Sequence, residues 1–579
     1  MQKKMLYALV SVIVAVIIIA AAAAILISAP ATPPGQHPKY QLELWYNNDG
    51  HYGDTEPSLA TVLKADIEAC GRVEVTLKSD TWAAYKTRWS QGQMPAFLLG
   101  WYPDYFDSDD YVSPFLSTSG AASLGSFYTN ATMDGWVTAE QTTTDPVART
   151  TYFNQIQDKL AVDVPYVPLF TGNAHVAYVS GVQNVVLHPV TFKWFIMDKS
   201  GATALNGSTT DKIVTLDPAS AYDYFSIEII NNVFDNMLVY EPNTANLVPA
   251  LVTRIPTVAN GDVSADGLNY TYHLKPGLSF SDGMELNATV MKRSINRAIR
   301  LDLPGSAAFL LYDVGGLTAN GRGGNDTAPG VITVAPNDRD ITFHLFKPVS
   351  FFNQLMAFSV SAPVPWNYNQ NGEQPSDAAS VLGNGPYMVT QHTPNQLIVL
   401  AANPNYDNPA LYSSFGIPTI PVMSTVNVNI RSDATALKQD IETHTSTGID
   451  VAYRTLTPTD LVDLQSRATA LGITVDVGSS PQIRYIVFNT RTITDVRIRQ
   501  AIAYSVNRAN IDNTVFNGLV EPLYSMIPSS FPYAQPVFQT QYGGSPSCSS
   551  ANNLLNLAGY VIKMPMPIAR VARDARDDK

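Results

Sequence analysis

Cysteine is almost absent from this chain of 579 residues, which has only Cys70 and Cys548. A disulfide-dense scaffold is therefore excluded, and the fold must depend on its hydrophobic core. If the chain lies outside the cell, the two cysteines can pair with each other. They can equally be two small buried hydrophobic side chains, and the sequence leaves both interpretations open.

Charge is also sparse, and it is mostly of one sign. Charged residues make up 15% of the chain, and the formal net charge is −13. An acidic balance argues against a nucleic-acid partner. The hydrophobic fraction of 45% is that of a globular protein, and the length predicts two or more lobes.

Several catalytic patterns are missing. No His, Cys or acidic residues fall at the spacing of a metal site, and no Gly-x-Ser-x-Gly motif is present. The glycine-rich stretch 315–324 lacks the Gly-Lys-Ser/Thr ending of a phosphate loop. Asp109 and Asp110 are adjacent, and we expect both to be solvated. We therefore expect no enzyme activity, metal or cofactor.

One long hydrophobic run stands at the N-terminus. Residues 5–27 are apolar and follow Lys3 and Lys4. About 20 apolar residues cross a bilayer, and the lysines favour an N-terminus inside the cell. We expect residues 1–28 to be an uncleaved transmembrane anchor, residues 29–39 to be a stiff linker, and the rest to lie at the cell surface. A cleaved signal peptide is the rival interpretation.

The first part of the chain alternates strands and helices. Hydrophobic patterns predict strands at 41–46, 73–77 and 97–99, and helices at 58–69 and 82–90. This order is typical of a parallel α/β sheet. Ligands of such sheets bind at the carboxyl ends of the strands.

The stretch 100–107 follows the third of these strands and is the best candidate site. It turns at Pro103 and places Asp104 between Trp101 and Tyr105. Aromatic rings exclude water and a carboxylate supplies negative charge, so the arrangement suits a cationic group. A polar loop that merely caps the strand is the alternative.

Later segments predict a second set of elements. Asp145-Pro146 starts a helix that continues through 147–162, and 209–216 reads as a strand. Segments 270–274 and 341–345 alternate, and we expect them to be antiparallel strands of one lobe.

Separated segments of the chain share a pattern with one known family. They are Trp82–Tyr85 with Gly100–Asp107, Thr215–Pro218 with Val233–Leu238, Thr271–Gly283, Gly383–Tyr387 with Asn403–Tyr406, Asn489 with Asp495–Ile502 and Asn507–Arg508, and Leu554–Tyr560. Together they resemble the family 5 extracellular solute-binding proteins, the dipeptide and oligopeptide receptors of ABC importers. The resemblance implies an α/β, two-lobed periplasmic-binding-protein-like fold (type II, cluster C-like). It also implies a monomer that captures peptides and delivers them to a membrane permease.

The segments stand in an altered order. In the family, the segment like 554–560 directly precedes the one like 41–46, whereas here they lie at opposite ends of the chain. This looks like a circular permutation, which a fold tolerates when the old termini are close together. It predicts that Tyr560 lies near Tyr40. A mis-assembled gene is the alternative.

The resemblance also implies a division into lobes. We expect residues 40–170 with 489–560 to form one lobe (lobe II) and residues 171–488 to form the other (lobe I). The chain would cross between them near 168–171 and 488–490, where a hinge would allow closure around the ligand. We expect residues 561–579 to be a disordered tail.

The resemblance assigns candidate ligand-binding residues. Asp104 matches the aspartate that holds the peptide α-amino group, with Trp101 as its aromatic neighbour. Tyr222, Asp223 and Tyr224 match a segment whose backbone pairs with an extended peptide.

One position departs from the family pattern. Dipeptide-binding members carry an arginine for the ligand carboxylate in the loop 47–54, where this chain has His51. The departure weakens a strict dipeptide assignment and keeps an oligosaccharide ligand as the alternative, with Trp45, Tyr46 and Trp101 stacking on sugar rings. A structural surface protein is also compatible with the anchor, although it would not need a hinge or a pocket motif.

Overall fold

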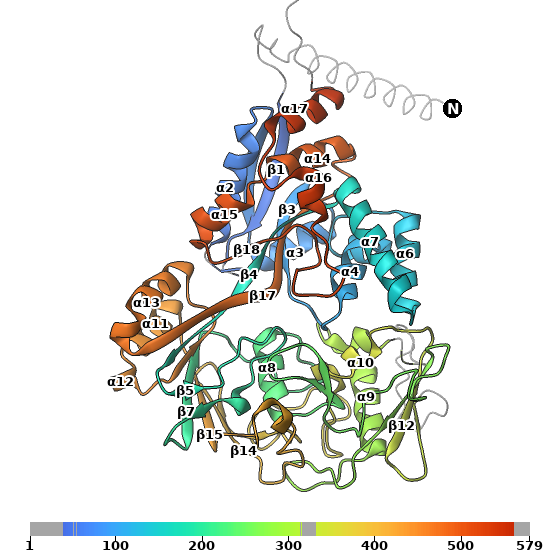
Figure 1. The fold of residues 1–579 in the computed structure, drawn as a ribbon, viewed down its shortest axis with the longest axis vertical. Helices are drawn as coiled ribbons and strands as arrows, with labels where there is room; N and C mark the ends of the chain where they lie inside the picture. The colour runs from blue at the N-terminus through green and yellow to red at the C-terminus, as the bar shows by residue number, and fades with distance from the viewer. Residues whose placement is uncertain (1–38, 50, 54, 313, 315–331, 561–579) are drawn as a thin grey trace, which may run out of the picture.

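The computed structural model describes residues 39–49, 51–53, 55–312, 314 and 332–560 (Figure 1). The fold is α/β and two-lobed, and one large sheet continues through both lobes. This sheet has eleven strands in the order β13-β14-β15-β7-β16-β4-β17-β3-β1-β2, with β18 paired to β4. The expected anchor, the glycine-rich stretch and the tail lie outside the described residues. No described helix is both long and apolar enough to cross a membrane.

The upper lobe in Figure 1 contains the predicted parallel sheet. Strand β1 pairs in parallel with both β2 and β3, which confirms the expected parallel sheet. Its strands are β1 (Tyr40–Asn47), β2 (Val73–Asp80), β3 (Ala96–Trp101) and β18 (Glu521–Pro522). Its helices are α2 (Glu56–Ala69), α3 (Trp82–Ser90), η1 (Ser108–Tyr111), α4 (Ser113–Leu116), α5 (Thr118–Ser123), α6 (Ala131–Thr142), α7 (Pro146–Asp163), α14 (Val496–Ser505), α15 (Arg508–Ile511), η6 (Asp512–Phe516), α16 (Val537–Tyr542) and α17 (Cys548–Leu557).

Two long strands connect the lobes. Strands β4 (Tyr166–Val179) and β17 (Ile473–Phe488) form an antiparallel pair that runs from the upper into the lower lobe (Figure 1). Their pairing shifts register between Ser479 and Ile483. One hydrophobic cluster contains the β4 residues up to Phe170 and the β17 residues from Ile483 onward, and another contains Val176 and Ile473.

The lower lobe contains two further hydrophobic clusters, the second of which also includes Tyr105 of the upper lobe. Around the large sheet it contains β5 (Val182–Gln183), η2 (Trp194–Ile196), β6 (Asp198–Lys199), β7 (Ala204–Thr209), α8 (Tyr224–Val233), β13 (Tyr387–Thr393), β14 (Leu397–Ala402), η5 (Ser413–Phe415), β15 (Thr425–Ile430), α11 (Ala434–Glu442), α12 (His444–Thr447), β16 (Val451–Tyr453) and α13 (Pro458–Leu471). Around the other core it contains β8 (Leu238–Tyr240), β9 (Leu247–Pro249), β10 (Asn269–His273), α9 (Ala288–Leu301), η3 (Ala307–Leu311), β11 (Ile332–Val334), β12 (Asp340–His344), α10 (Phe352–Leu355) and η4 (Ser359–Ser361). Strands β10 and β12 pair antiparallel, as the sequence predicted.

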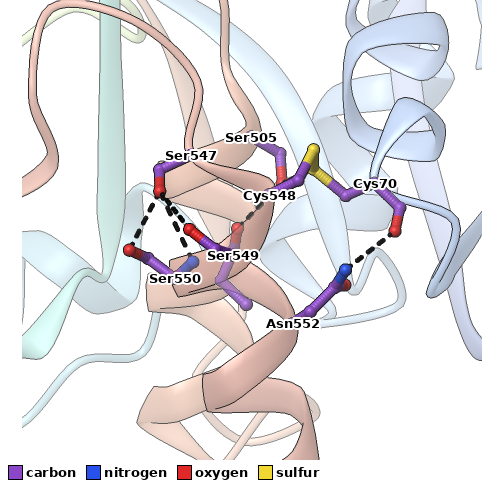
Figure 2. The surroundings of a disulfide bond; sticks show 8 residues. Cys70, Ser505, Ser547, Cys548, Ser549, Ser550 and Asn552 are labelled. Atoms are coloured by element: carbon purple, nitrogen blue, oxygen red, sulfur yellow. Dashed lines mark hydrogen bonds between the residues drawn. A yellow bond between two sulfur atoms is a disulfide. The ribbon is translucent and has the colours of Figure 1, made fainter.

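The two ends of the described chain meet at the top of the upper lobe. The rings of Tyr40 and Tyr560 lie 5.4 Å apart, which confirms the predicted proximity. Arg72 donates to the carbonyl oxygen of Tyr560 at 3.0 Å. Cys70 at the end of α2 and Cys548 at the start of α17 form a disulfide with a Cα–Cα distance of 4.9 Å (Figure 2). The sequence left open whether the two cysteines pair or are separate buried side chains, and in the structure they pair.

Candidate functional site

A cavity of about 180 Å³ lies where the carboxyl end of β3 faces helix α8. The upper lobe contributes the turn that follows β3. The lower lobe contributes one face of α8 with two neighbouring loops. The lining residues are Trp101, Tyr102, Pro103, Asp104, Val190, Tyr222, Tyr224, Ile227, Asn231, Ala357 and Phe358. The cavity therefore lies between the lobes and at the carboxyl end of a strand, which is where ligands of parallel sheets are expected to bind.

Asp104 is the acidic residue of this cavity. Its side chain is 8% exposed, and both carboxylate oxygens accept hydrogen bonds from the Tyr222 hydroxyl, at 2.7 and 2.8 Å. No Lys or Arg in the described part of the chain forms an ion pair with it. Burial raises the pKa of Asp104 to about 7, although the Tyr222 hydrogen bond acts in the opposite direction. The carboxylate is thus held in the cavity without a cation.

A second buried acid, Asp110, holds the turn that carries Asp104 in place. Asp110 accepts hydrogen bonds from the backbone N–H of Asp104 at 2.6 Å and from Trp101 Nε1 at 3.3 Å. These bonds fix the positions of both cavity residues. Burial, and then the nearby charge of Asp104, raise the pKa of Asp110 well above its usual range. Two neighbouring buried carboxylates therefore share this site.

Asp109 and Asp110 are each only 1% exposed, so the expectation that both are solvated is wrong. The segment folds back under the cavity instead of facing water. Asp109 accepts from the Tyr105 hydroxyl at 2.6 Å and from Gln141 Nε2 at 2.9 Å. Tertiary hydrogen-bond donors therefore offset the cost of burying this side chain.

Arg149 of α7 provides a cation for the same acidic segment. It forms ion pairs with Asp107 at 2.6 Å and with Glu140 at 3.0 Å, and all three side chains are buried. Its guanidinium is thus occupied by two carboxylates. It is therefore not available to pair with Asp104.

The structure brings together four of the predicted site residues. Trp101, Asp104, Tyr222 and Tyr224 all line the cavity. Tyr222 is 36% exposed, so its ring stands at the cavity mouth, and it lies edge-on to Phe309 with ring centroids 5.7 Å apart.

The other four predicted residues lie outside the cavity lining. Tyr105 is buried beneath the turn and stacks on Phe351 with ring centroids 4.6 Å apart. Asp223 caps α8 by accepting from the backbone N–H of Ser226. His51 stacks on Trp82 at 3.6 Å, and Tyr46 packs against the core of the upper lobe.

Several cavity residues were missed from the sequence. Ile227 and Asn231 lie on the same face of α8 as Tyr224, at helical spacing. That spacing was the available signal, although it is equally typical of core packing. Ala357 and Phe358 belong to a loop far away in the sequence. Only the tertiary fold brings that loop to the cavity.

No group of three or more His, Cys, Asp and Glu side chains within the described ranges is arranged to hold a metal ion. A buried carboxylate provides charge, and the walls are aromatic and aliphatic. Such a site can bind an ammonium group attached to an apolar body.

Comparisons with known proteins identify relatives. The chain is 24% identical over 346 residues to the oligopeptide-binding protein OppA of Bacillus subtilis (strain 168), an alignment that covers 57% of each protein. It is 25% identical over 325 residues to the dipeptide-binding protein of Lactococcus lactis subsp. cremoris (strain MG1363), covering 53% of this chain and 54% of that one. The chain thus spans little more than half the length of these curated relatives.

Solved structures give a weaker likeness. The clavulanic acid biosynthesis oligopeptide binding protein 2 matches with a TM-score of 0.48 and 21% identity, over 62% of this chain and 64% of that one. The model of the bacterial extracellular solute-binding proteins, family 5 Middle, matches residues 18–123 and 246–568. These matched residues make up more than half of the chain, which therefore belongs to the family 5 extracellular solute-binding proteins.

Proposed function

We propose that this protein is the ligand-capturing component of an ABC importer. It binds short peptides by their free amino terminus in the cavity between the lobes and delivers them to a permease. The observation that carries the proposal is the buried carboxylate of Asp104, which has a hydroxyl donor but no cation. A ligand ammonium would supply the missing charge.

The cavity walls fit the rest of such a ligand. The side chains of Trp101, Ile227 and Phe358 offer apolar contact beyond the charged end. The volume of about 180 Å³ is below the usual range of about 300–1,000 Å³ for ligand pockets. A ligand of one or two residues suits this closed form, and a longer one requires wider separation of the lobes.

Closure would use the two connecting strands as a hinge. We place the hinge at the register shift of β17, between Ser479 and Ile483, and at the facing residues 171–173 of β4. The side chains of Ile483 to Phe488 pack with the upper lobe. This packing supports a lobe boundary near residue 483, a few residues before the boundary near 488 that the sequence suggested. Residues 40–170 with 483–560 would then rotate against residues 171–482.

An oligosaccharide is the alternative ligand. Aromatic side chains in the cavity can stack on sugar rings, but a sugar is neutral and leaves Asp104 without a counter-charge. The buried carboxylate therefore favours an amine.

The family assignment supports a location on the outer side of the cytoplasmic membrane. We propose that residues 1–28 hold the protein there as an anchor. We also propose that the chain is a circularly permuted member of its family. The contact between Tyr40 and Tyr560 supports this by placing the two ends side by side.

The test is calorimetric titration of the full-length protein with L-Ala-L-Phe and with N-acetyl-L-Ala-L-Phe. We expect only the free amine to bind well. Asp104→Asn should weaken binding by about 2–5 kcal/mol, because a buried ammonium loses its counter-ion. Asp476→Asn removes a carboxylate that accepts from Tyr178 outside the cavity, and it should leave affinity unchanged. Equal binding of both peptides, or unchanged binding in Asp104→Asn, would refute the proposal.

A further inference from the structure

Tyr222 has a position that ligand binding alone does not explain. It stands just before α8 in the lower lobe, whereas Asp104 belongs to the upper lobe. Its hydroxyl is 2.7 Å from one carboxylate oxygen of Asp104 and 2.8 Å from the other. A single O–H thus lies between both oxygens. A bidentate ammonium donor would occupy this same place.

The lobes are in contact around this bond. Tyr102 donates to the carbonyl oxygen of Pro189 at 3.3 Å, and its ring meets Tyr224 with centroids 4.8 Å apart. On the far side of the turn, Tyr105 stacks on Phe351. The protein is therefore closed with its own hydroxyl at the charged end of the cavity.

We propose that Tyr222 is an internal latch: its hydroxyl occupies the ammonium position of Asp104 in the empty protein, holds the lobes together, and must be displaced by the ligand. This inference rests on the proposed function for its account of ligand affinity. It makes Tyr222 a determinant of affinity, because it sets one minimum binding strength that every ligand must exceed. Every ligand must compete with the same intramolecular bond, so the apparent affinity of every ligand is lowered by the same factor.

Because every ligand must displace the Tyr222 hydroxyl, a charged ligand can still bind measurably where a neutral one cannot. An ammonium exchanges a neutral donor for a charged one, which adds the attraction between opposite charges to the hydrogen bond. When a ligand hydroxyl replaces the Tyr222 hydroxyl on Asp104, one neutral donor replaces another, and little binding free energy is gained. Neutral hydroxylated compounds would therefore bind too weakly to be carried, although their contacts with the cavity walls are the same.

The variant Tyr222→Phe tests the latch because it removes one oxygen and retains the ring beside Phe309. The matched control is Tyr178→Phe. The Tyr178 hydroxyl also donates to an aspartate, Asp476, at 2.9 Å, but this bond joins β4 to β17 outside the cavity. The probes are L-Ala-L-Phe and L-lactoyl-L-phenylalanine, in which a hydroxyl replaces the α-amino group.

At pH 8, we expect Tyr222→Phe to bind both probes about tenfold more tightly than the unaltered protein, by equal factors. Tyr178→Phe should change neither affinity. Weaker or unchanged binding of L-Ala-L-Phe by Tyr222→Phe would overturn the latch while leaving the proposed function intact. Failure of the unaltered protein to bind L-Ala-L-Phe would instead count against the proposed function.

A second measurement tests the latch without any ligand. The radius of gyration from small-angle X-ray scattering reports whether the empty protein is open or closed. We expect a larger radius for ligand-free Tyr222→Phe than for the unaltered protein or Tyr178→Phe. Equal radii for all three proteins would overturn the latch, whatever the ligand is.

Discussion

Replacing Asp104 by asparagine should make the protein more stable at pH 8 while weakening its function. The pKa of this carboxyl rises from 3.8 to about 7 on folding because the group is buried. The folded state therefore binds more protons than the unfolded state between these values, and stability falls as the pH rises through this window. At about 1.4 kcal/mol per pKa unit, the ionised carboxylate costs about 4 kcal/mol above pH 7.

The expected gain is smaller than this cost. Asparagine can still accept the hydrogen bond from Tyr222, but its amide N–H groups need acceptors, which costs about 1–3 kcal/mol if they find none. We therefore expect Asp104→Asn to gain about 1–3 kcal/mol at pH 8 and less at pH 5. Urea unfolding followed by circular dichroism at both pH values gives the two differences.

A neighbouring acid provides the control. Asp107 is buried in the same turn but pairs with Arg149, so Asp107→Asn should lose about 3–5 kcal/mol. Opposite signs for the two variants would show that the missing cation makes Asp104 costly. If Asp104→Asn is less stable than the unaltered protein at pH 8, or differs from it equally at pH 5 and pH 8, the reasoning is wrong.

Three further predictions concern the site and the scaffold. Because ammonium binding requires ionised Asp104, affinity for L-Ala-L-Phe should fall about tenfold per pH unit below pH 7 in calorimetric titrations, and a flat profile from pH 5 to 7 would contradict this. Replacing Cys70 and Cys548 by serine should lower the free energy of unfolding by about 2–5 kcal/mol, since the bond closes a loop of 478 residues; equal urea midpoints would refute it. Arg297→Met should cost about 3–5 kcal/mol in urea unfolding by leaving buried Asp217 unpaired, and a loss below about 1 kcal/mol would disprove that account.

Local signals predicted much of the fold. Asp145 caps α7 by accepting from the backbone N–H of Val147, with Pro146 in the first turn, as the sequence indicated. Alternating patterns identified β10 and β12 and their antiparallel pairing. Such signals succeed because capping, proline placement and strand alternation each depend on a few adjacent residues.

Long-range contacts account for the errors. A strand was predicted over 209–216, but β7 ends at Thr209. The backbone N–H groups of Val214 and Leu216 donate instead to the hydroxyls of Ser226 and Ser376, which the sequence does not place nearby. A segment with strand-like composition therefore stays outside the sheet because other partners satisfy its backbone.

In the candidate site, too, local motifs could be predicted from the sequence and long-range contacts could not. Asp104 and its aromatic neighbour Trp101 could be chosen from one short motif, because the chemistry of the site is local there. The burial of Asp109 could not be foreseen, because it depends on Gln141 from another helix. The position of Phe358 in the cavity wall likewise follows from the meeting of two lobes.

Peptide capture as proposed requires Asp104 to receive a ligand ammonium between the lobes. A crystal structure of the protein with L-Ala-L-Phe tests this most directly. We predict that the α-amino nitrogen lies within about 3.2 Å of an Asp104 carboxylate oxygen, in the place where the Tyr222 hydroxyl contacts Asp104 in the structure described above. A peptide bound elsewhere, or bound here with its amino group in solvent and Tyr222 still on Asp104, would contradict the account.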